Sequence, residues 1–145
     1  MDLITFFFRL SSSVKLYHWN TSSYARHVSS GDLFDSVIST TDKFMETYFG
    51  RYGKGQIASV DASAELYDDR EVVSFLKEAI MFLNDIVKNR LVKETDTDLL
   101  NIRDDLVGHI NKTLYLFKFN WILNNLWYSL RLYMVVSYYG LNHHQ

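Results

Sequence analysis

The sequence predicts an all-α fold, a four-helix bundle followed by one more aromatic-rich helix, and three observations support this prediction. The chain of 145 residues contains no proline, although average usage would give about seven. Four segments repeat apolar residues at steps of three and four, which is the period of an amphipathic helix. A chain of this length buries roughly 70% of the surface that it exposes when unfolded, so it needs no disulfide or metal to fold as one domain.

The composition excludes several classes of protein. With no cysteine, the chain has no disulfide, zinc–thiolate site, iron–sulfur cluster or thiol nucleophile. Fifteen basic and seventeen acidic residues nearly cancel, and no stretch is dense in Lys and Arg, so the sequence argues against nucleic-acid binding. The start MDLITFFFRLSSSVK lacks the basic region and long apolar core of a secretory signal. We therefore expect an intracellular protein.

The first two helices are predicted over residues 2–19 and about 23–49. Asp2 is placed to cap the first helix. The first helix presents one apolar face, made of Leu3, Phe6, Phe7, Leu10, Val14 and Tyr17. For the second helix we predict that the buried stripe contains Phe34, Ile38, Thr41, Met45 and Tyr48, with Val37 and Phe44 beside it.

Residues 50–69 form a long connection, which a bundle needs if its second and third helices are to run parallel. We expect Ile57, Val60 and Leu66 to give this connection apolar contacts. The third helix is predicted over about 70–91, with Asp69 as its cap and an inward face of Val72, Phe75, Leu76, Ala79, Leu83, Ile86 and Val87. The fourth runs from Thr97 to about Lys118, with Leu99, Ile102, Leu106, Ile110, Thr113 and Phe117 inward.

The chain changes character after Lys118, so we divide it into a bundle at residues 1–118 and an apolar helical extension at 119–145. Residues 119–139 have the length of a membrane-spanning helix. They are interrupted by Asn120, Asn124, Asn125 and Arg131, and an arginine near the bilayer centre costs at least about 2.5 kcal/mol. We therefore favour packing of this extension on the bundle or on a partner over membrane association.

Four residues suggest chemistry: His18, His27, Asp42 and Glu46. They lie in YHWNTSSYARH and, fourteen residues later, in DKFME. This pattern resembles the ferroxidase signature of Dps-type miniferritins. The spacing from His27 to Asp42 to Glu46 matches that signature, whereas the interval from His18 to His27 is shorter, and Gly31 stands where the family has another acidic ligand. The resemblance implies a ferritin-like four-helix bundle that forms a homo-oligomer and binds iron, with the histidines and the acids of each site supplied by different subunits.

The chain also resembles a small uncharacterised family encoded by large DNA viruses and bacteriophages. The segments that carry this resemblance are YHWNTSSYARH, GRYGK and TDLLNIRDDLVGHINKTLYL, and it covers roughly residues 10–117. It implies a ferritin-like fold, and the host cytoplasm as location for a viral protein, but no activity.

Imidazole and carboxylate ligands together suit iron or manganese, and Asp42 and Glu46 share a helix face because they are four residues apart. Two plainer interpretations remain open: His18 as a hydrogen-bonded core residue, and the two acids as a solvated flank. The Glu-x-x-His pairs of single-chain di-iron bundles are absent. Asp105 and His109 either add a ligand or form an ordinary contact within their helix.

Two functions of different classes follow. The first is a ferritin-like protein that binds or oxidises iron, or binds manganese, with no organic cofactor. The alternative is a non-enzymatic viral or phage helical bundle that serves interaction or assembly.

Overall fold

The computed structural model of the chain contains four helices: α1 (Leu3–Asn20), α2 (Tyr24–Tyr52), α3 (Glu71–Asn89) and α4 (Thr97–Gly140). It describes the backbone of residues 1–140 apart from positions 56, 58 and 61, and the side chains of that part as far as position 119, apart from 87 and 88. Within this described part of the chain there is no strand. The predicted all-helical fold is therefore confirmed.

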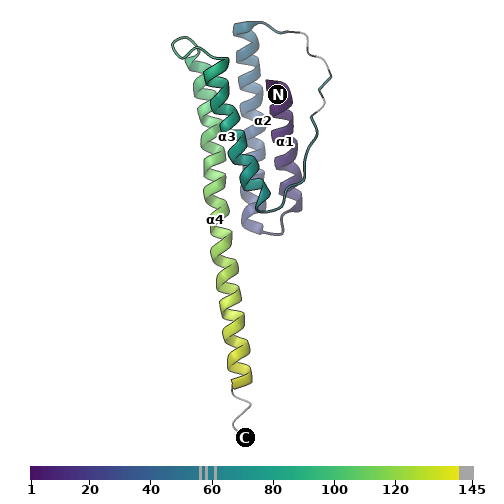
Figure 1. The fold of residues 1–145 in the computed structure, drawn as a ribbon, viewed down its shortest axis with the longest axis vertical. Helices are drawn as coiled ribbons and strands as arrows, with labels where there is room; N and C mark the ends of the chain where they lie inside the picture. The colour runs from purple at the N-terminus through teal and green to yellow at the C-terminus, as the bar shows by residue number, and fades with distance from the viewer. Residues whose placement is uncertain (56, 58, 61, 141–145) are drawn as a thin grey trace.

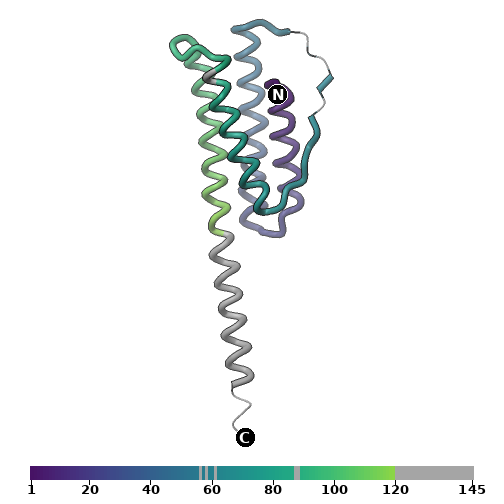
Figure 2. Tube along the Cα trace, in the orientation of Figure 1, coloured from purple at the N-terminus to yellow at the C-terminus, as the bar shows by residue number. Residues whose placement is uncertain are grey.

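The helices alternate in direction around the bundle. In Figure 1, α1 and α4 run one way while α2 and α3 run the other, and the connection from α2 to α3 returns along the outside, past α1. The same path can be followed along the Cα trace in Figure 2. Helix α2 packs against both α1 and α4, and α3 packs against α4. The long connection thus allows α2 and α3 to run parallel, as its length predicted.

One apolar core joins the four helices. The predicted inward faces of α1, α3 and α4 are buried, apart from Val87, whose side chain lies outside the described residues. The prediction for α2 is confirmed only in part. Val37 is fully buried, and Phe34, Met45 and Tyr48 are half-buried and pack against the core, but Ile38 is 48% exposed. The side chains that α2 buries are Ser29, Ser30, Leu33, Val37, Thr40 and Phe44.

The helix ends follow local chemistry. Asp2 caps α1, as predicted, because its side chain accepts a hydrogen bond from the Thr5 N–H at 2.9 Å. Helix α3 is capped differently from the prediction: Asp68, not Asp69, accepts from the N–H groups of Arg70 and Glu71, at 2.7 and 2.8 Å. Asp69 instead accepts hydrogen bonds from Tyr17 of α1 and Arg26 of α2.

Polar contacts hold the long connection on α1, and an aromatic contact holds it on α3. The Arg9 guanidinium donates to Glu65 at 3.0 Å and to the Tyr67 hydroxyl at 3.2 Å. The Glu65 N–H donates to the Ser13 hydroxyl, and the Tyr67 ring stacks on Phe75 with 4.6 Å between centroids. Ile57, Val60 and Leu66, from which we expected apolar contacts, are instead exposed.

The fourth helix is longer than predicted. Where we expected one helix to Lys118 and another after it, the structure has a single helix over Thr97–Gly140. Among the residues that the structure describes, no helix offers a stretch both apolar and long enough to span a membrane. The expected packing of residues 119–145 concerns side chains almost wholly outside the described part, so it stays a prediction.

Candidate functional site

The turn between α1 and α2 brings His18 and His27 into direct contact. Their imidazole rings stack with centroids 3.9 Å apart and planes inclined by 22°. Nδ1 of His18 lies 2.7 Å from the His27 carbonyl oxygen, and Nδ1 of His27 lies 2.8 Å from the His18 carbonyl oxygen. The two residues therefore form a reciprocal pair that ties the end of α1 to the start of α2.

These hydrogen bonds determine where the ring protons lie. A carbonyl oxygen only accepts, so Nδ1 of each histidine must carry a proton and donate it. In the neutral form of each ring, Nε2 is then the nitrogen with a free lone pair. Histidines that bind metals commonly have this arrangement, with the other ring nitrogen donating to a backbone carbonyl or a carboxylate. The pair thus has the tautomer of a metal-binding histidine.

Gly31 lies directly beside the His18 ring. A Cβ atom at position 31 would lie 3.0 Å from Cε1 and 3.3 Å from Nδ1 of that ring. Because real Cβ contacts are rarely so short, any side chain at this position requires the ring to move. The absence of the acidic residue that the miniferritin pattern has here thus has a steric reason in this chain.

Asp42 and Glu46 lie farther along α2, and both are exposed. Asp42 follows His27 by fifteen residues, which corresponds to roughly 22 Å along a helix. Throughout the described portion of the chain, no three His, Asp or Glu side chains are grouped closely enough to hold a metal ion. A single copy therefore does not bring the two histidines together with the two acids.

Asp42 borders an apolar groove between α1 and α2, with a volume of about 520 Å³. Three of its apolar side chains are strongly exposed, Phe8 at 56%, Ile57 at 51% and Ile38 at 48%. The other apolar residues that line it are Ile4, Phe7, Met45 and Phe49. Of the stripe that we expected α2 to bury in the core, Ile38, Thr41 and Met45 thus line this groove.

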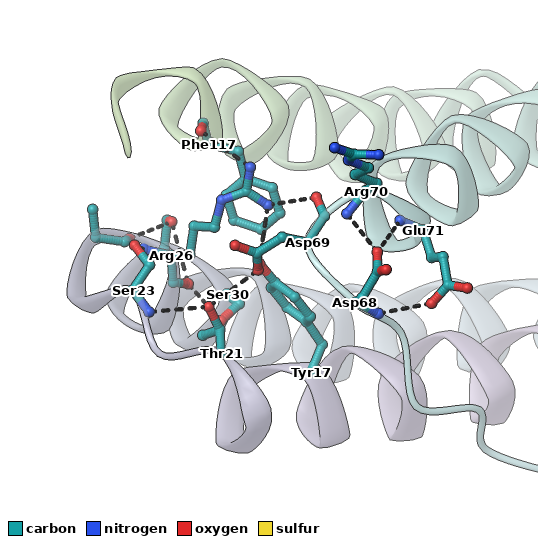
Figure 3. A network of polar contacts seen from close by, with 12 residues as sticks. Tyr17, Thr21, Ser23, Arg26, Ser30, Asp68, Asp69, Arg70, Glu71 and Phe117 are labelled. Atoms are coloured by element: carbon teal, nitrogen blue, oxygen red, sulfur yellow. Dashed lines mark hydrogen bonds and ion pairs between the residues drawn. The ribbon is translucent and has the colours of Figure 1, made fainter. Parts of the chain in front are cut away.

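A second polar cluster, shown in Figure 3, joins α1, α2 and α4 to the end of the connection just before α3, and it was not predicted. Arg26 donates to the Tyr17 hydroxyl at 3.1 Å and to the Asp69 carbonyl at 2.8 Å, while the Tyr17 hydroxyl donates to the Asp69 carboxylate at 2.7 Å. The Arg26 guanidinium also lies 4.7 Å from the ring centroid of Phe117 on α4. Burial is the main reason that the pKa of Tyr17 is raised. We interpret this cluster as structural.

The pair on α4 stays apart from these residues. Nε2 of His109 lies 3.7 Å from a carboxylate oxygen of Asp105, one turn away on the same helix. Both side chains are more than a third exposed. This geometry fits an ordinary contact within a helix, the plainer of the two interpretations.

Comparison with known proteins gives a family but no activity. Neither a curated protein nor a solved structure matches the chain. The model of a family of unknown function, DUF5856, matches residues 18–117. The matched range covers more than half of the chain, begins at His18 and ends at Phe117, and includes Asp42 and Glu46. The chain therefore belongs to DUF5856, a family of unknown function, which confirms the expected membership of an uncharacterised family.

Proposed function

We propose that the protein is a ferritin-like bundle that binds iron(II) or manganese(II) between two copies of the chain. The imidazoles come from the pair of His18 and His27 in one copy, and the carboxylates come from Asp42 and Glu46 of the other. The observation that carries the proposal is the reciprocal hydrogen bonding of the pair, which leaves Nε2 as the nitrogen available to a metal. Nitrogen and oxygen ligands in this mixture suit both metals.

The topology supports the ferritin-like part of the proposal. Helical bundles with one long crossover between antiparallel pairs include the ferritin-like folds, whose metal sites use side chains that project from the helices. The four helices and the single long connection between α2 and α3 match this description.

The surface of α2 supports the use of two copies. At about 100° per residue, Ile38, Asp42 and Met45 lie within roughly 60° of His27 around the helix axis. His27 is thus at one end of a face, and Asp42 lies farther along it in the lining of the apolar groove, with Glu46 about 100° from His27 around the axis. A two-fold axis that crosses α2 midway between His27 and the two acids, at the Ile38 end of the groove, places the imidazoles of each copy against the carboxylates of the other, because such an interface pairs one surface with itself. It also covers the exposed apolar side chains.

The test is metal binding by calorimetry, under anaerobic conditions for iron(II). We expect the intact chain to bind manganese(II) or iron(II) at neutral pH and the double variant Asp42→Asn, Glu46→Gln to lose this binding. Asp32→Asn is the matched control, because Asp32 is also an exposed acid of α2 but points about 140° from His27 around the axis. Both acids are exposed, so circular dichroism should show unchanged helix content. The absence of metal uptake by the intact chain would contradict the proposal.

A second candidate is a non-enzymatic interaction or assembly module. The observation that favours it is the exposed apolar groove, in a chain whose described residues contain no complete ligand set. This candidate predicts a stable dimer in the presence of EDTA and no metal uptake. The first candidate predicts metal uptake that depends on Asp42 and Glu46.

A further inference from the structure

We infer that His27 is the metal ligand of the pair, that His18 is a positioning residue which holds it, and that each site therefore takes one imidazole and one divalent ion. This inference rests on the proposed function, which does not say which of the two histidines coordinates the ion. It is carried by the geometry of three residues, His18, His27 and Gly31.

The stacked rings do not suit chelation of one ion by both histidines. A metal ion binds imidazole nitrogen at about 2.0–2.1 Å, along the lone pair and hence in the ring plane. The two planes are inclined by only 22°, with centroids 3.9 Å apart. An ion shared between them would lie over the ring faces, where neither nitrogen directs its lone pair. The reciprocal Nδ1 hydrogen bonds hold both rings in this orientation.

The surroundings distinguish the two imidazoles. His27 is exposed, whereas His18 is half-buried. The position that a Cβ on Gly31 would take lies within 4.0 Å of Cε1, Nδ1 and Nε2 of His18, so α2 covers that edge of the ring. A carboxylate from a second copy therefore reaches an ion bound to His27 more easily than an ion bound to His18.

The contacts of His18 define its role as a positioning residue. Its Nδ1–H donates to the His27 carbonyl, and its ring packs flat on the His27 ring. The Ser30 hydroxyl lies 3.4 Å from the same nitrogen. The His18 ring thus restricts rotation of the His27 ring by stacking, while the His18 backbone carbonyl accepts the His27 Nδ1–H. Hydrogen-bond partners that orient a ligating histidine in this way typically contribute about 10–100-fold to metal affinity.

The number of ligands then sets the number of ions. His27 with Asp42 and Glu46 of the other copy supplies three protein ligands, which is enough for one ion with open positions for water. The two-metal carboxylate sites of helical bundles use about six protein ligands, four of them Glu. Gly31 cannot supply an additional carboxylate, and the His18 ring occupies the space where one would lie.

Pulsed electron paramagnetic resonance of bound manganese(II) provides the main test, because it detects and counts coordinated imidazole nitrogens. We expect one imidazole per ion and one ion per chain in the intact protein. The matched variants are His18→Phe and His27→Phe, which make the same change on either side of the stack. His18→Phe should keep the nitrogen signal and weaken binding by less than about tenfold, because the backbone carbonyl that accepts the His27 Nδ1–H remains, whereas His27→Phe should remove the signal.

A second measurement needs neither a variant nor a metal. Long-range ¹H–¹⁵N correlation spectra of the metal-free chain should show both histidines protonated on Nδ1 and not on Nε2 at a pH where the rings are neutral. Two imidazoles per ion, or two coupled manganese ions per site, would overturn the inference and leave the proposed function standing. Protons on Nε2 would overturn the inference and would also remove the hydrogen bonding that supports the proposed function. Failure of the intact chain to bind manganese or iron instead removes the proposed function itself.

Discussion

At the scale of single residues, Asp96 is a buried carboxylate in the turn between α3 and α4. It accepts hydrogen bonds from the Tyr52 hydroxyl and from the Val92 N–H, the latter at 2.7 Å, and lies 3.3 Å from Nε of Arg51. These contacts, the Tyr52 hydroxyl foremost, lower the pKa of Asp96 below its ordinary value of 3.8. Asp96 therefore joins the end of α2 to the turn that precedes α4.

The lowered pKa predicts a pH dependence of stability. A carboxyl group whose pKa is lower in the folded state stabilises the fold above its unfolded pKa, and this stabilisation is lost as the pH falls through the folded pKa. We expect the urea midpoint to decrease from pH 5 to pH 3. Asp96→Asn should lower the midpoint at pH 5 and reduce this decrease, whereas the exposed control Asp32→Asn should do neither. An unchanged pH dependence in Asp96→Asn would contradict the prediction.

Tyr17 gives the second prediction at this scale. Its hydroxyl accepts from Arg26 and donates to Asp69, and its side chain is only 1% exposed. Tyr17→Phe leaves both partners short of a hydrogen bond, so it should lower the free energy of unfolding by about 1–3 kcal/mol. Tyr24→Phe is the matched control, because Tyr24 is 82% exposed. Equal urea midpoints for the two variants would show that the cluster does not stabilise the fold.

At the scale of helices, the end of α2 depends on one glycine. Gly53 has a φ of 82°, a conformation that residues with a Cβ rarely adopt, and its N–H donates to the Phe49 carbonyl. Gly50, three residues earlier, lies within the helix. Neither has a heavy atom within 4 Å of the position that a Cβ would take, so only backbone conformation distinguishes them.

The same substitution should therefore have opposite effects at these two sites. Gly53→Ala should lower the free energy of unfolding by about 1–3 kcal/mol, because Gly53 combines its positive φ with a ψ of 149°, a conformation that is nearly confined to glycine. Gly50→Ala should raise it by about 0.5–1 kcal/mol because alanine favours the helix. Urea unfolding measures the change in the free energy of unfolding for each variant. A stabilising Gly53→Ala would contradict the assigned helix end.

At the scale of the whole molecule, α2 carries apolar residues on two stripes. One stripe, with Leu33, Val37 and Phe44, packs in the core. The other, with Ile38 and Met45, lines the groove beside α1. Since exposed apolar surfaces of this kind mark interaction sites, the second stripe explains why the proposed function uses two copies of the chain.

A charge placed in the groove should therefore separate the two copies. Ile38→Asp is expected to convert a dimer to a monomer in analytical ultracentrifugation, with little loss of helix content because Ile38 is already 48% exposed. Met81→Asp is the control: Met81 is 68% exposed on α3, away from the groove. A monomeric intact chain, or a dimer that survives Ile38→Asp, would contradict an interface at this groove.

The sequence by itself determined the four helical segments and most of their buried faces, since a clean period of three to four residues leaves one apolar face to bury. It did so for Leu10 on α1, Leu76 on α3 and Ile110 on α4, all of which lie in the core. It also indicated membership of an uncharacterised family and selected His18 and His27, which the structure brings into contact.

Only the tertiary structure decided which stripe of α2 enters the core. Val37 and Ile38 are adjacent and similarly apolar, so the local pattern does not distinguish them, whereas packing against α1 and α4 buries one and exposes the other. The same limit applies to Asp69, whose role depends on Tyr17 more than fifty residues earlier. It applies also to Gly31, because the reason for a glycine at this position is the His18 ring, which lies where a side chain would begin. Contacts between residues distant in sequence arise from the arrangement of the helices, which no local periodicity specifies.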